Sequence, residues 1–348
     1  MTELLEIRDR IKGIFASYEV FILPVVKFLL GLVCFGMLNS KLGYMTRINN
    51  IAVVLILALL CSFLPPVGMV LLAALISLLH LYALSLEAAI IGFAVYLVMF
   101  LLFFRFAPKD SVAVILTPIT CALGLPCIVP ISAGLLGGPS SAVSVGCGVM
   151  VYILLHGITQ SAPTINGMED SEATAKVRLV VDSLLGNKQM IVMIAAFAIT
   201  VIVAYLVRRM AIDYSWTIAI IAGALVDIII LLVGDLMYDT NISFLSIIIS
   251  SLLGALIGKL VEFFRFGLDY NRTEKVQFED DEYYYYVKAV PKLSVVGGEK
   301  TVKRINTAKS RKRTRYEDDY YDRGRGTYVG RYEEDDEYYD DAYEDDEY

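Results

Sequence analysis

Residues 243–264 read SFLSIIISSLLGALIGKLVEFF, and the chain changes character directly after them. A helix of this length spans the roughly 30 Å hydrocarbon core of a bilayer. The block at residues 279–286, EDDEYYYY, is acidic and rich in tyrosine. Residues 1–265 hold 15 basic and 15 acidic side chains, whereas residues 266–348 hold 15 and 22, so the tail carries the whole net charge of −7. The sequence therefore predicts a membrane-embedded body followed by a soluble tail.

Further apolar runs precede this one, most of them long enough to cross a bilayer. They cover residues 20–38, 51–64, 67–84, 88–104, 111–136, 141–156, 190–207 and 216–237. Only helices and closed barrels satisfy their own backbone hydrogen bonds in lipid, and runs of this length favour helices. The predicted fold class is an all-α membrane protein. It is a polytopic helical bundle of about eight spans plus a Pro/Gly-rich broken or re-entrant hairpin, with a disordered cytoplasmic C-terminal tail.

Two places interrupt the apolar pattern with proline. Pro65 and Pro66 divide one long run into two pieces, which predicts a tight turn or a broken helix, because proline lacks a backbone donor. The second place, residues 117–139, contains four prolines and four glycines: Pro118, Pro126, Pro130, Pro139, Gly124, Gly134, Gly137 and Gly138. Irregular backbone at membrane depth is tolerated where it is buried in protein or lines a cavity. This segment therefore predicts a pore or substrate path, with Pro126 and Pro130 as candidate path residues.

Asp227 lies near the middle of the run at 216–237, where a charge costs about 2.5–3.5 kcal/mol or more. Lys27 and Lys259 are the candidate partners, since both lie in apolar runs and have long side chains. One interpretation is a proton- or cation-binding carboxylate in a transport path that continues through Asp235. The alternative is a structural aspartate that is protonated or paired within the bundle.

The last apolar run carries a small residue at every fourth position along one helical face. These residues are Ser246, Ser250, Gly254 and Gly258. Small residues let two helix backbones approach closely in lipid. The stripe predicts helix packing, either within the chain or between copies in a homo-oligomer.

Signatures of catalysis or metal binding are missing from the sequence. The five cysteines all lie in apolar runs without zinc-site spacing, and the two histidines, His80 and His156, lie in different runs. No nucleophile elbow, phosphate-binding loop or H-E-x-x-H pair occurs. We therefore expect no enzyme activity, cofactor or metal site.

The domain organisation follows from hydropathy and charge. Residues 1–19 predict an amphipathic cytoplasmic helix, and residues 20–265 a transmembrane domain. An extracytoplasmic loop is expected at 159–189, with helical apolar spacing at 171–185. Residues 266–296 form a juxtamembrane acidic and tyrosine-rich segment, in which 287–296 is apolar enough for a short strand. Residues 297–348 predict a disordered polyampholyte, since eight basic residues at 300–315 stand between acidic blocks.

Orientation follows from the lysines and arginines of the short loops. Eight of them can face the cytoplasm together if the run at 111–136 enters and leaves the membrane on one side: Arg8, Arg10, Lys12, Arg105, Lys109, Arg208, Arg209 and Arg265. Lys41 and Arg47 then lie on the opposite side, against the rule. This arrangement predicts that both termini are cytoplasmic.

Two functions fit these features. The first is a membrane scaffold that recruits cytoplasmic proteins through the tail, with the lipid bilayer as its other partner. The second is a transporter or permease for a small solute or ion that uses residues 117–139 and Asp227. Glu87-Ala88-Ala89 followed by Gly92 resembles the EAA loop of ABC-importer permeases, but the glycine comes one residue early and the run that follows is a membrane span. Carboxylates in the tail would repel phosphate, which argues against a nucleic-acid partner.

Two stretches carry a family resemblance. Residues 278–292, FEDDEYYYYVKAVPK, and residues 137–146, GGPSSAVSVG, resemble blocks of an uncharacterised family of multi-pass membrane proteins of Clostridia and related Firmicutes. The resemblance implies a bacterial plasma membrane and assigns no activity.

Overall fold

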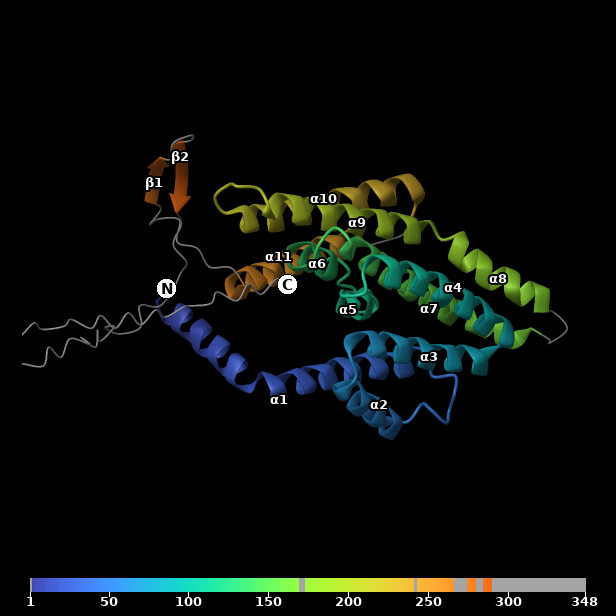
Figure 1. Cartoon of the computed structure of the whole chain (residues 1–348). Coiled ribbons are helices and arrows are strands. Elements are labelled where there is room, and N and C mark those ends of the chain that lie inside the picture. Colours follow the sequence, from blue (N-terminus) through green and yellow to red (C-terminus); the bar gives the residue numbers. More distant parts are fainter. Residues whose placement is uncertain (1, 169–172, 241–242, 266–273, 280–283, 290–348) are drawn as a thin grey trace, which may run out of the picture. The chain divides into compact units, whose positions relative to one another are not determined.

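The computed structural model describes residues 2–168, 173–240, 243–265, 274–279 and 284–289. These residues form helices and one two-stranded antiparallel sheet (Figure 1). The helices are α1 (Thr2–Lys41), α2 (Ile51–Phe63), α3 (Pro66–Leu84), α4 (Leu86–Phe106), α5 (Ser111–Ala122), α6 (Ile128–Leu136), α7 (Ser141–Gly167), α8 (Ala173–Leu185), α9 (Lys188–Arg208), α10 (Ser215–Tyr238) and α11 (Phe244–Arg265). The strands are β1 (Glu274–Glu279) and β2 (Tyr284–Ala289).

Within the described ranges, seven helical stretches are long and apolar enough to cross a membrane. They are α1, α3, α4, α7, α8 together with α9, α10 and α11. The prediction of an all-α, polytopic membrane protein is confirmed. The difference from the expected count comes from α2, whose 13 residues extend about 20 Å at 1.5 Å per residue, less than the hydrocarbon core.

Helices α2 and α3 form a hairpin, here called the α2–α3 hairpin, that turns at the predicted Pro65–Pro66 break. The Lys27 ammonium of α1 donates to the Leu64 carbonyl at this turn, with a distance of 3.2 Å from Nζ to O. At the far end of α3, His80 Nε2 lies 3.0 Å from the Asn39 side-chain oxygen of α1. Since α2 starts just after the end of α1 and α3 returns to Asn39, both open ends of this hairpin lie at the Lys41 end of α1.

The predicted broken segment is also a pair of short helices, the α5–α6 hairpin. The hydroxyl of Ser141, the first residue of α7, donates to Asp110 Oδ2, just before α5, at 2.7 Å. Ser144 of α7 donates to the carbonyl of Ala107, at the end of α4, at 3.4 Å. The segment therefore enters and leaves the bundle at one end, as the sequence predicts.

Several helix termini meet at this same end. The Arg208 guanidinium, at the end of α9, donates to the carbonyls of Leu135, in the last turn of α6, and Gly137, just beyond it. It also lies 5.7 Å from the ring centre of Trp216, at the start of α10. Arg8 of α1 lies 5.8 Å from the ring centre of Phe263, near the end of α11. We call this end the cationic end, because the loop cations that the sequence groups together lie here.

Two boundaries differ in detail from the sequence expectation. From Thr2 on, helix α1 covers the expected amphipathic segment at 1–19, and its backbone leaves helical geometry at Tyr18 (φ −117°, ψ 20°). The loop expected at 159–189 is mostly helical, because α7 continues to Gly167 and α8 follows. Val180 and Leu184 of α8 are buried, and α8 packs on α4 and α7. The apolar spacing at 171–185 thus marks a packed helix.

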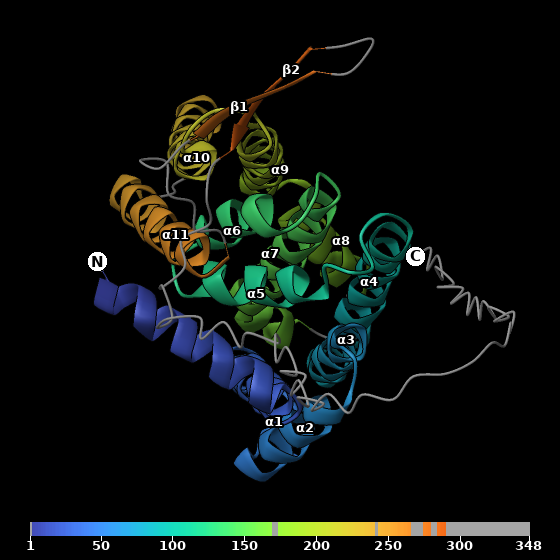
Figure 2. The ribbon, with the colours of Figure 1, turned by 60° about the vertical axis from the view of Figure 1, so that its left-hand side comes forward.

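Helix α6 lies inside the bundle, where it packs against α7, α9, α10 and α11 (Figure 2). Its buried residues include Ile131 and Leu135, which form a small apolar core with residues of α10. Helix α5 also packs on α7, and its other neighbours are α3 and α1. The two arms of the α5–α6 hairpin therefore share α7 and differ in their remaining neighbours.

Strands β1 and β2 pair antiparallel, with Phe278 opposite Tyr285. Strand β2 lies within the block at 278–292 that carries the family resemblance, whereas β1 ends with its first two residues. Strand β2 also includes the start of the predicted strand at 287–296. Tyr284, Tyr285 and Val287 are exposed. The rest of the segment at 266–296 and the tail at 297–348, predicted to be disordered, lie outside the described residues.

Candidate functional site

The break between α5 and α6 is held against α11. Gly124 has a positive φ of 76°, a conformation that suits glycine, and its carbonyl accepts from the Ser246 hydroxyl at 3.1 Å. After Pro126, the backbone N–H of Cys127 donates to the Ser250 hydroxyl at 2.8 Å. The serines of the small-residue stripe thus take up polar backbone groups that the helix break leaves unpaired.

The glycines of the stripe allow α11 to pack closely against neighbouring helices. A Cβ at Gly254 would lie 2.9 Å from Ile131 Cδ1 and 3.1 Å from the Cys127 carbonyl oxygen. A Cβ at Gly258 would lie 3.2 Å from Ile220 and from Leu135. The stripe therefore forms an intramolecular contact with α6 and α10, one of the two alternatives that the sequence left open.

Asp227 of α10 is fully buried, with 0% of its surface exposed. The Thr200 hydroxyl of α9 donates to its Oδ1 at 3.2 Å, and the Cys127 side chain at the break also interacts with the carboxyl group. The other oxygen, Oδ2, has no hydrogen-bond partner among the described residues. Asp227 thus faces the break with one oxygen unsatisfied.

Hydroxyl groups of α11 complete the surroundings of this carboxyl group. Ser250 and Ser251 both lie close to the Cys127 thiol, and the buried Ser251 hydroxyl, like Asp227 Oδ2, makes no hydrogen bond within the described residues. We call Cys127, Thr200, Asp227, Ser250 and Ser251 the Asp227 cluster. Its residues come from the helix break and from helices α9, α10 and α11.

The lysines predicted as partners of Asp227 lie elsewhere, so that expectation is wrong. Lys27 is bound to the Leu64 carbonyl, which needs a donor because the carbonyls at a helix C-terminus have no partner within the helix. Lys259 donates to Glu262 at 2.8 Å and to Thr217 at 2.6 Å. An ion pair three residues away on the same helix is a nearer partner than a buried carboxylate on another helix.

The other predicted path residues lie around the cluster. Asp235 lies about two turns beyond Asp227 on α10, and its Oδ1 accepts from the Thr240 hydroxyl at 2.7 Å. Pro126 directly precedes Cys127, and Pro130 is buried within α6. Pro126 therefore belongs to the break, whereas Asp235 belongs to the end of α10.

The cluster constrains the state of the Asp227 carboxyl group. Burying a carboxylate without a compensating charge is costly, and such a group is stable as the neutral acid or with a bound cation. In the described residues, no three His, Cys, Asp or Glu side chains are arranged to hold a metal ion. The Asp227 cluster offers one carboxyl group and several hydroxyls, a set suited to a proton or a monovalent cation.

Comparison with known protein families, with curated proteins and with solved structures finds no match to the chain. The site is therefore interpreted from its own geometry.

Proposed function

We propose that this membrane protein is a transporter for a small solute or ion, and that Asp227 takes up and releases the coupling proton or cation. The observation that carries the proposal is the fully buried carboxyl group beside the break of the α5–α6 hairpin, one oxygen of which has no hydrogen-bond partner among the described residues. Helices broken near the membrane midplane recur at substrate and coupling-ion sites of transporters. Intramembrane carboxyl groups mark proton and ion pathways in many membrane proteins.

The proposal requires that Asp227 reach water in another conformation. The α5–α6 hairpin is the candidate moving element, because it enters and leaves at the cationic end and does not cross the bundle. By the positive-inside rule, we assign the cationic end to the cytoplasm, which puts the N-terminus there. A bacterial plasma membrane and the absence of enzyme activity are part of the same proposal.

A pH-jump experiment tests the role of Asp227 without a known substrate. Full-length protein is reconstituted in liposomes on a solid-supported membrane, and the charge displaced by a rapid change of external pH or sodium concentration is recorded. We expect a transient current for the wild type that Asp227→Asn abolishes, because the amide neither binds a proton nor carries a charge in this pH range.

Asp182→Asn is the control, since it changes an exposed carboxyl group of α8 that pairs with Arg178 and lies outside the cluster and the predicted path. It should keep the transient. A current of equal size in Asp227→Asn, with the variant correctly folded by gel filtration, would refute the proposal.

A scaffold function is the second candidate. The exposed aromatic side chains of Tyr284 and Tyr285 on β2 favour it, since exposed tyrosines are common in protein interfaces. Deletion of residues 274–348, which removes these tyrosines together with the tail, should then remove partners that co-purify with the full-length chain. An unchanged set of partners would count against recruitment through the tail.

A further inference from the structure

A cavity separate from the Asp227 cluster opens between α1, α3, α4, α5 and α7. It encloses about 190 Å³. Helix α3 contributes Val70, and the first arm of the α5–α6 hairpin contributes Ile115 and Pro118. The cavity thus joins the two helical hairpins that enter the bundle from opposite ends.

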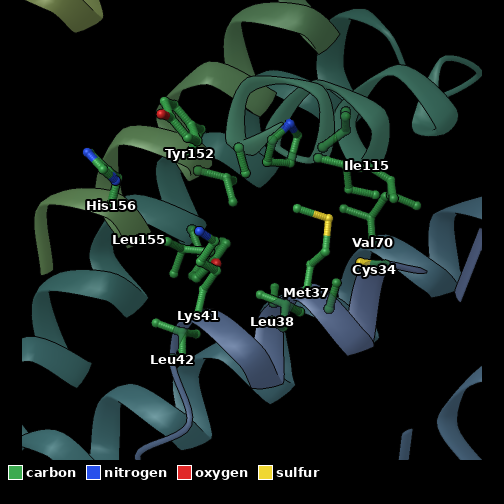
Figure 3. Close-up of a pocket in the computed structure, with 18 of the residues that line it drawn as sticks. Cys34, Met37, Leu38, Lys41, Leu42, Val70, Ile115, Tyr152, Leu155 and His156 are labelled. Carbon is green, nitrogen blue, oxygen red and sulfur yellow. The ribbon is translucent and has the colours of Figure 1, made fainter. Parts of the chain in front are cut away.

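The walls of this cavity are apolar over most of their surface. Cys34, Val70 and Ile115, which lie together at one side of the cavity (Figure 3), are all buried. Tyr96 also lines the cavity. Its hydroxyl is hydrogen-bonded to the Ser77 hydroxyl at 2.6 Å, so its aromatic ring is the part that adds to the apolar wall. Such walls fit a hydrocarbon chain and offer little to a compact, hydrated ion.

Polar groups gather at the opposite side of the cavity. Lys41, Tyr152 and His156 lie there (Figure 3). The rings of Tyr152 and His156 stack with centroids 5.5 Å apart. The Gln160 amide nitrogen lies 3.0 Å from His156 Nε2 and donates to it, so Nδ1 carries the hydrogen of the neutral ring.

The charge at this side is positive. Among the described residues, no aspartate or glutamate lines the cavity, and Lys41 has no acidic partner. Lys41 is also a cation at the end of the bundle where the positive-inside rule does not expect one. A role in binding an anion accounts for this position.

We propose that the cavity binds a single-chain anionic amphiphile, with its hydrocarbon chain against Val70 and Ile115 and its anionic head group on Lys41 and His156. A fatty acid and an anionic lysophospholipid share this chemistry. The proposal for this cavity does not rest on the proposed transport role of Asp227.

Binding of radiolabelled laurate to the full-length protein in phosphatidylcholine nanodiscs tests the proposal. We expect Lys41→Gln to weaken binding by at least about tenfold, since a charge-assisted hydrogen bond is lost, and Lys41→Arg to keep it. Arg47→Gln is the matched control, because it removes a cation of the following loop that does not line the cavity; it should bind like the wild type. Equal losses in Lys41→Gln and Arg47→Gln, or no loss in Lys41→Gln, would overturn the proposal.

Competitors define the head group. Unlabelled laurate should displace the label, whereas dodecanol and dodecyltrimethylammonium should compete at least about tenfold less well. Displacement by dodecanol as effective as by laurate would overturn the anionic specificity. If lysophosphatidylglycerol competes as strongly as laurate, the anion can come from a lipid head group. If lysophosphatidylglycerol does not compete, the site is restricted to fatty acids. Both results support the binding of an anionic amphiphile.

Filling the cavity tests the place of the hydrocarbon chain. Val70→Phe should abolish laurate binding, whereas Leu71→Phe, at an exposed neighbouring position of α3, should not. Ile119→Phe on α5 fills the same cavity from the other wall and serves if Val70→Phe fails to fold. Undiminished binding in a folded filling variant would refute this location.

Discussion

Gly134 gives a sharp test of how the α5–α6 hairpin is held. A methyl group at this position of α6 would lie 2.7 Å from Ala204 Cβ and 2.9 Å from the Val201 carbonyl oxygen, both on α9. Neither atom belongs to the far end of a flexible side chain, so α6 or α9 has to move. Gly134→Ala should therefore destabilise the fold through overpacking.

The size of this loss of stability follows from comparison with a second buried glycine. A methyl group at Gly146 of α7 would meet its nearest atom, Ile194 Cγ2, at 3.7 Å, an ordinary contact. Both replacements gain about 1 kcal/mol of helix propensity, but only Gly134→Ala adds an overpacking cost of about 1–3 kcal/mol. The propensity gain cancels in the difference, so Gly134→Ala should be less stable than Gly146→Ala by about 1–3 kcal/mol.

Equilibrium unfolding in mixed detergent micelles measures this difference. Trp216 is the only tryptophan and lies against Arg208 at the junction of α9 and α10, so its fluorescence reports the region next to the mutation. Equal free energies of unfolding for the two variants, or a less stable Gly146→Ala, would refute the packing of α6 against α9.

Two further predictions concern the two hairpins. Lys27→Met should lower the free energy of unfolding by about 1.5–3 kcal/mol, because the hydrogen bond from its ammonium to the Leu64 carbonyl is lost; an unchanged value in the same assay would show that the turn does not need this donor. Ser141→Ala should speed amide hydrogen exchange across residues 110–141, since its hydroxyl joins the two ends of the α5–α6 hairpin by bonding Asp110 and the Gly138 N–H. Exchange that rises equally in α10 would instead indicate general destabilisation.

The breaks in the helices could be predicted because their cause is local. Proline removes a donor and restricts the residue before it wherever it lies, so Pro65, Pro66 and Pro126 mark the turns of both hairpins. Hydropathy did not reveal that α2 is too short to cross. An apolar run that stops inside the bundle has the same composition as one that crosses it.

The surroundings of Asp227 could be predicted only in part. Its depth follows from its position in an apolar run, but hydropathy does not say which neighbouring helix it faces. Thr200 and Cys127 come from other elements, and a lone hydroxyl or thiol in an apolar run gives no signal of its own. The expected pairing of Lys27 with Asp227 fails because a long side chain can reach many acceptors. The sequence signal for the true partner of Lys27 is Leu64, which lies at a helix end before Pro65 and Pro66, so that its carbonyl needs a donor from outside the helix.

The two hairpins suggest how one bundle could serve both proposed sites. The α2–α3 hairpin opens toward the Lys41 end and the α5–α6 hairpin toward the cationic end, and α3 packs against α5. Under the proposed transport function, a shift of the α5–α6 hairpin would expose the Asp227 cluster from the cationic end without moving a polar loop across the bilayer.

Because Ile115 and Pro118 of α5 line the amphiphile cavity, the same shift would change that cavity. A ligand that fills the cavity would then hold α5 in place and oppose the opening at Asp227, so laurate should reduce the pH-jump current of the wild type but not that of Lys41→Gln.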